Sequence, residues 1–77
     1  MINEELCTSV SERLRVPSEV RETAGGCAYI IFNHSGRRFS LMPSFDDKWV
    51  IRYPFPASKQ KREYFDDIDE LIERINK

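Results

Sequence analysis

Two cysteines and one histidine are the residues of this 77-residue sequence that are most suited to catalysis or metal binding. A metal site needs several converging ligands, and Cys7, Cys27 and His34 have no ligand spacing that supports one. A cysteine–histidine pair can do nucleophilic chemistry, but nothing in the sequence places the two together. No glycine-rich loop opens a helix, as a phosphate-binding nucleotide site would require. We therefore expect no cofactor, no metal and no catalysis, and interpret the cysteines as small apolar residues and His34 as a turn residue.

Charged side chains form two clusters near the C-terminus. Lys59, Lys61 and Arg62 form a basic stretch, which is either a solvated loop or, with Arg37, a set of phosphate or partner contacts. Residues 63–73 contain six acids and no basic residue. Helical spacing places four of these acids on one face: Asp66, Asp69, Glu70 and Glu73. That acidic face is either simply solvated, or imitates the phosphate line of a nucleic acid or docks on a basic protein patch.

The size and composition predict one small cytoplasmic domain, residues 1–77. The net charge of −1 and the pI of about 5.8 provide no global positive field that would attract nucleic acid. The chain has no apolar run long enough to span a membrane, and its start lacks the basic and then apolar pattern of a signal peptide. We therefore expect no membrane association, while monomer and homodimer both stay open.

Two segments are predicted to be amphipathic helices, residues 3–15 and 67–76. Asn3 and Asp66 are expected to cap them, because their side chains can accept hydrogen bonds from the first backbone amides. Apolar residues recur at helical spacing in both segments: Leu6, Val10 and Leu14 in the first, and Ile68, Leu71, Ile72 and Ile75 in the second.

Between the helices, alternating β-forming residues predict strands at 27–33, 37–42 and 48–55, with 19–23 and 61–65 as further candidates. His34-Ser35-Gly36 is interpreted as a three-residue hairpin loop, with the glycine at positive φ. The predicted fold class is therefore α+β, with an antiparallel sheet of three or four strands and an amphipathic helix at each end.

Turn lengths predict the register of the sheet. Asn33 should pair with Arg37 across the glycine loop, and Met42 with Lys48 across the next turn. Both registers place one aromatic and aliphatic set on a common face, which we expect to be the core: Tyr29, Ile31, Phe39, Leu41, Trp49 and Ile51.

The other face of the predicted sheet sets Arg38 directly opposite Arg52, beside Ile30 and Phe32. Like charges facing each other across strands are unfavourable, unless an acid neutralises them. The two arginines either extend into water or pair with helix acids, or they form, with Phe32, a site for an anion or an acidic partner. If both helices pack on the aromatic face, this arginine face is the better candidate for the partner-binding surface. If one helix lies on each face, the acidic helix is the better candidate.

Two stretches resemble known families. Residues 19–43, EVRETAGGCAYIIFNHSGRRFSLMP, resemble the hairpin region of HicA-type toxins, which are small mRNA-cleaving proteins of the double-stranded-RNA-binding fold. The catalytic histidine of that family would fall near Cys27 or Ala28, where this sequence has none.

The second resemblance is to SH2 phosphotyrosine-binding domains. It rests on Val20-Arg21-Glu22-Thr23, on Gly26 to Tyr29, and on Phe65 with Glu70-Leu71-Ile72. It implies that Arg21 is the phosphate ligand, although Ser18 and Glu19 are polar where a central buried strand needs apolar residues.

These observations favour a non-enzymatic binding module that docks on a larger protein or nucleoprotein assembly and modulates or inhibits it. By analogy of size and charge alone, small inhibitors and adaptors of phages and mobile elements have this character. The alternatives are a small nucleic-acid-binding domain, a degenerate HicA-like RNA-binding protein of the double-stranded-RNA-binding fold, or a degenerate or unrecognised small ribonuclease. The expected partner surfaces are the Arg38 and Arg52 face and the acidic helix.

Overall fold

The computed structural model describes residues 1–77 and contains two helices and five strands. In chain order these are α1 (Glu4–Arg13), β1 (Ser18–Glu22), β2 (Ala28–His34), β3 (Arg37–Pro43), a 3₁₀ turn (Phe45–Asp47), β4 (Trp49–Tyr53), β5 (Lys61–Phe65) and α2 (Ile68–Asn76). The predicted α+β class with a helix at each end is confirmed. The sheet has five strands rather than three or four, because both candidate segments form strands, β1 and β5, at its two edges.

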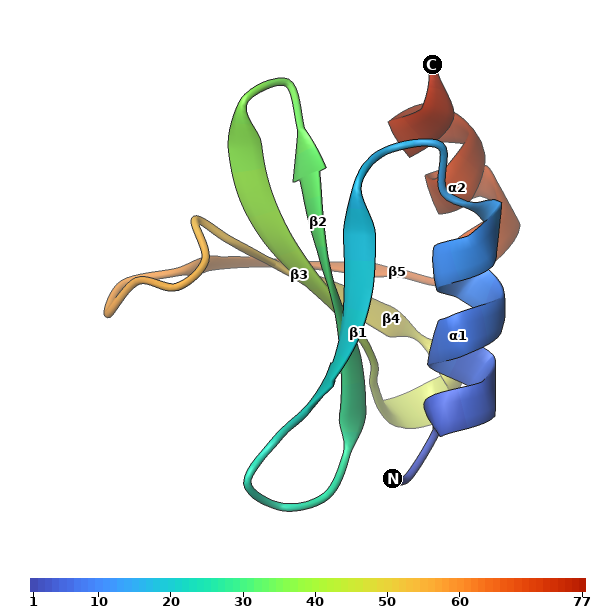
Figure 1. The fold of residues 1–77 in the computed structure, drawn as a ribbon, viewed down its shortest axis with the longest axis vertical. Coiled ribbons are helices and arrows are strands. Elements are labelled where there is room, and N and C mark those ends of the chain that lie inside the picture. Colours follow the sequence, from blue (N-terminus) through green and yellow to red (C-terminus); the bar gives the residue numbers. More distant parts are fainter.

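Each strand of the sheet pairs antiparallel with the next strand along the chain. Both helices lie side by side on one face of this sheet, and the opposite face carries no helix (Figure 1). The core lies between the helices and the sheet, and its most buried members are Cys7, Val10, Ala28, Ile30, Phe32, Leu41, Trp49, Leu71 and Ile72. No helix is long and apolar enough to cross a membrane.

The β2–β3 hairpin turns over two residues, not the predicted three. Ser35 and Gly36 have φ of 53° and 74°, and His34 pairs with Arg37 beside them. Two successive residues at positive φ are typical of a type I′ turn, whose twist matches that of the flanking strands. The predicted three-residue loop and the pairing of Asn33 with Arg37 are therefore wrong.

This change of one residue reverses which face each β2 side chain occupies. Ile30 and Phe32 face the helices and are 0% and 1% exposed, so Phe32 is a core residue rather than the predicted partner contact. Tyr29 and Ile31 lie on the opposite face, so their predicted place in the core layer is wrong. Ile31 is nevertheless buried there.

The β3–β4 hairpin differs from the prediction by two residues and so keeps the predicted faces. Leu41 pairs with Ile51 and Pro43 with Trp49. The difference arises in the turn, where the chain reverses with Asp46 and Asp47 at positive φ. Because side chains alternate with a period of two, these strands keep the same residues on the core face.

The apolar stripe predicted for α2 is confirmed, whereas in the first stripe Val10 and Leu14 are buried but Leu6 is 46% exposed. Both predicted caps are wrong. Asn3 has left-handed backbone geometry and its side chain makes no capping hydrogen bond. Asp67, rather than Asp66, caps α2, because its carboxylate accepts hydrogen bonds from the amides of Asp69 and Glu70. In α1 the fully buried residue is Cys7, which supports its interpretation as an apolar residue.

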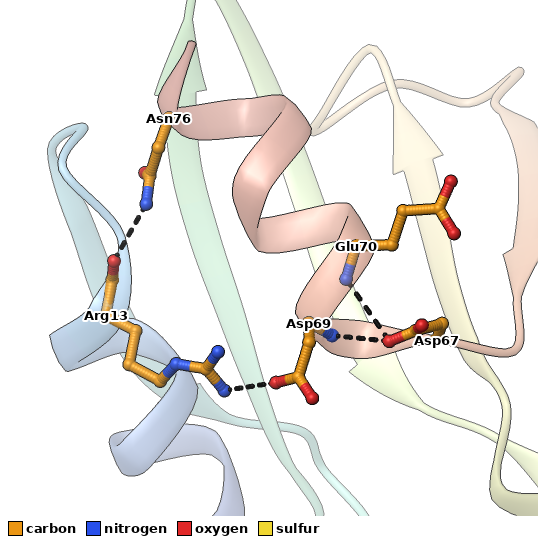
Figure 2. A network of polar contacts seen from close by, with 5 residues as sticks. All are labelled: Arg13, Asp67, Asp69, Glu70 and Asn76. Carbon is orange, nitrogen blue, oxygen red and sulfur yellow. Dashed lines mark hydrogen bonds and ion pairs between the residues drawn. The ribbon is translucent and has the colours of Figure 1, made fainter.

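Polar contacts tie the ends of the two helices together (Figure 2). The Arg13 guanidinium lies 2.7 Å from an Asp69 carboxylate oxygen. The Asn76 side chain donates to the carbonyl of Arg13 at 3.0 Å and accepts from the amide of Arg15 at 2.8 Å. These contacts join the C-terminal end of α1 to α2, beside the apolar core that both helices share.

Candidate binding face on the sheet

The face of the sheet opposite the helices is called the helix-free face below. The pairing registers place two residues of β1, two of β5 and eight of the three strands between them on this face. Its members are Glu19, Arg21, Tyr29, Ile31, Asn33, Arg38, Ser40, Met42, Val50, Arg52, Arg62 and Tyr64. Four arginines and two tyrosines are thus displayed where neither helix covers them.

The arginines of this face are poorly neutralised. Arg52 pairs across strands with Arg62, not with Arg38 as predicted. Arg38 pairs with Asn33 and lies on the same face, two residues along β3 from Ser40, the neighbour of Arg52. Arg38, Arg52 and Arg62 take part in none of the four ion pairs of the structure. The repulsion expected from the sequence is therefore present, but between β4 and β5.

Arg52 is the least satisfied of the three. Its Nε atom is buried and makes no hydrogen bond. A buried donor without a partner costs about 1–3 kcal/mol, and more when the group is charged. An anion placed against the guanidinium groups of Arg52 and Arg62 would relieve the repulsion between them.

Arg52 also borders a pocket of about 320 Å³ on the helix-free face. The β4–β5 loop, residues 54–60, extends on the side of the sheet opposite the helices (Figure 1). From this loop, the Phe55 ring contacts Tyr29 edge-on at a centroid distance of 6.0 Å. The remaining walls come from the β1–β2 connection and from the sheet: Glu22, Thr23, Ala24, Ser40 and Met42.

A second aromatic group lies at the β5 edge of the same face. The Tyr64 ring is 5.7 Å from the ring of Phe45, and the two residues are 48% and 63% exposed. Tyr64 and Tyr29 belong to one row across the sheet, because Val50 pairs with Tyr64 and Met42 with Val50. Aromatic residues thus stand on both sides of the face.

Arg21 differs from the other arginines because it forms an ion pair with Glu19 on its own strand. Its strand, β1, lies at the edge of the sheet. The SH2 resemblance implied Arg21 as a phosphate ligand, but here its charge is already compensated.

The other predicted basic contacts are not brought together. Arg62 lies on the helix-free face, whereas Arg37 and Lys61 alternate toward the helix side and Lys59 lies in the β4–β5 loop. Arg37 borders a separate groove of about 300 Å³ beside α2, whose floor includes Phe32.

The predicted acidic surface is solvent-exposed on α2, but half of it is already paired. Asp69 is bound to Arg13, and Asp66 lies 3.6 Å from Lys48. Glu70 and Glu73 are exposed and form no ion pair.

The sequence prediction missed Tyr29, Phe55 and Tyr64 as candidate site residues. The only available signal was their aromatic type, since the one-residue shift in β2 had assigned Tyr29 to the core. The structure nowhere brings three or more His, Cys, Asp or Glu side chains into a group that could hold a metal ion.

Comparison of the chain with family models, with curated proteins and with solved structures found no match.

Proposed function

We propose that the protein is a non-enzymatic binding module that docks through its helix-free face on an anionic surface of a larger protein or nucleoprotein assembly and modulates that assembly. The observation that carries the proposal is the set of three unpaired arginines, Arg38, Arg52 and Arg62, on the one sheet face without a helix. Unpaired surface cations of this kind guide association with anionic partners and add specificity.

The distribution of charge supports the same orientation of docking. The helix side exposes acids from both helices: Glu4, Glu5 and Glu12 from α1, and Asp69, Glu70 and Glu73 from α2. The net charge of −1 is therefore divided into an acidic helix side and a basic sheet face. An anionic partner is attracted to one side of the molecule and repelled from the other.

The test is affinity capture from an extract of the native host, with the purified protein as bait. The triple variant Arg38→Gln/Arg52→Gln/Arg62→Gln removes the three unpaired charges. A matched control, Arg15→Gln/Arg74→Gln/Lys77→Gln, removes the same charge from residues outside that face which also form no ion pair.

Wild type and the matched control should recover the same partner. The triple variant should recover it at least about tenfold less well, and recovery should fall between about 50 and 200 mM salt. Equal recovery by the triple variant, or the absence of any arginine-dependent partner, would show the proposal to be wrong.

A further inference from the structure

We infer that the anion recognised by the helix-free face is a single-stranded nucleic acid, with its phosphates on Arg38, Arg52 and Arg62 and one base in the pocket that Tyr29 and Phe55 line. The inference rests on the proposed function and adds the chemical class of the partner. It is carried by the combination of unpaired cations and aromatic rings on one face that no helix covers.

The arginines provide the phosphate contacts. Directly paired residues in an antiparallel sheet are about 5 Å apart at Cα, so the Arg52 and Arg62 guanidinium groups can contact one phosphate or two successive ones. Guanidinium groups bind phosphate oxygens bidentately, and none of these three guanidinium groups is engaged in an ion pair. Arg38 extends the same basic surface toward the β2–β3 turn.

The pocket beside Arg52 provides the base contact. Its volume of about 320 Å³ is at the lower end of the range of small-ligand pockets. Tyr29 and Phe55 offer ring surfaces, while Thr23 and Ser40 offer hydroxyl groups to polar atoms of a ligand. A planar heteroaromatic ring joined to a phosphate meets both requirements, because the cation and the aromatic rings line one cavity.

A single strand fits this face better than a duplex does. Bases in a duplex are stacked and paired, whereas unpaired bases can be splayed out onto aromatic side chains. Tyr64 and Phe45 form a second exposed aromatic pair, and Tyr64 lies two residues along β5 from Arg62. A strand that follows the row from Tyr29 to Tyr64 would therefore meet aromatic rings at both ends, with Arg52 and Arg62 in the neighbouring row to contact its phosphates.

The experiment measures fluorescence anisotropy of labelled single-stranded RNA and DNA of about 12 nucleotides, a typical site length for such modules. An abasic DNA strand of the same length presents the phosphates without bases, and a duplex presents bases that are paired. The proteins are wild type, the arginine triple variant, its matched control, Tyr29→Ala, Tyr29→Phe and Phe55→Ala. Circular dichroism establishes that each variant is folded.

Wild type should bind the base-bearing single strand about tenfold more tightly than the abasic strand or the duplex. Tyr29→Ala and Phe55→Ala should each weaken single-strand binding about tenfold, while Tyr29→Phe keeps it. The plot of log affinity against log salt should have a slope of about −2 for three phosphates, and a slope near zero for the triple variant.

Three results would overturn the inference. Equal binding of the abasic strand, or no effect of Tyr29→Ala and Phe55→Ala, would mean that the face binds polyanions without regard to bases. Arginine-dependent capture of a protein that survives nuclease treatment, with no oligonucleotide binding, would identify an acidic protein partner and leave the proposed function intact. If no anionic partner of any kind depends on the arginines, both proposals fail.

Discussion

Arg52 is the residue that links the packing of the sheet to its proposed function. It faces Arg62 across the β4–β5 pair, its Nε is buried without a hydrogen bond, and it borders the aromatic pocket. A protein selected only for stability would be expected to place an acid at one of these positions, because opposite charges stabilise a cross-strand pair. The unfavourable arrangement is explained if an anion completes it.

Removing one of these charges should stabilise the free protein. Arg62→Gln leaves the exposed β5 position polar and relieves the repulsion on Arg52, so the free energy of unfolding should rise by about 0.2–1 kcal/mol. Urea denaturation at low salt measures this gain, which should shrink as salt screens the pair. Arg15→Gln, outside this face, should give no such gain. A salt-independent loss of stability in Arg62→Gln would contradict the repulsion.

The buried thiol of Cys7 leads to a prediction about how the stability of the fold depends on pH. Burial raises the pKa of its thiol to about 11 from a usual value of 9.0, so the folded state keeps a proton that the unfolded chain loses at lower pH. The contribution of this thiol to stability is then fully present below pH 9.0 and is lost as pH rises toward about 11, by about 3 kcal/mol in all.

Urea denaturation of Cys7→Ala and of its parent across this pH window measures how much the thiol contributes to the pH dependence of stability. The pKa of Tyr53 is also raised, first by its hydrogen bond to Glu63, so both proteins should carry Tyr53→Phe. The loss of stability at high pH should be smaller in the Cys7→Ala protein. Identical pH profiles would mean that the thiol does not contribute.

Among the elements, α2 depends on a cap that the sequence placed one residue too early. Asp67 satisfies two amides of the first turn, whereas Asp66 makes only an exposed ion pair with Lys48. Asp67→Ala should therefore cost about 1 kcal/mol, and Asp66→Ala a few tenths at most, in urea denaturation. Equal costs for the two variants would argue against the cap.

The β2–β3 turn determines which face each side chain of β2 occupies. In a type I′ turn Ser35 and Gly36 both need positive φ, and asparagine adopts that geometry more readily than serine. Ser35→Asn should therefore raise the melting temperature. No such gain would be expected if the hairpin loop had three residues. Gly36→Ala should cost about 1 kcal/mol through backbone strain alone, since its added Cβ would meet no atom within 4 Å.

Across the whole molecule, both helices pack on one shared core and leave the other face of the sheet without a helix, and polar contacts link the end of α1 to α2. Asn76→Ala removes both hydrogen bonds to the end of α1 and should cost about 1 kcal/mol. Glu73→Ala, on the same helix but without a partner, is the matched control and should change stability little. Equal urea denaturation curves for the two variants would mean that this link contributes nothing.

The pattern of residue types was sufficient for much of the fold. Helical periodicity located α2 within one residue, and alternating β-formers and turn residues located the strands, because these signals act over a few neighbouring residues. The same local signals marked Arg38, Arg52 and Arg62 as cations of interest, since charge is a property of the residue type.

The tertiary structure alone decided which residues share a face. The difference between a two-residue and a three-residue turn is one position, and that one position moves Phe32 into the core and Tyr29 onto the helix-free face. The packing of both helices on one side depends on apolar contacts between residues far apart in the sequence, such as Cys7 and Val10 of α1 and Leu71 and Ile72 of α2, which no local pattern specifies. The aromatic pocket beside Arg52 depends on the register of β2 and on where the β4–β5 loop lies over the face, and for that reason it could not be predicted from the sequence.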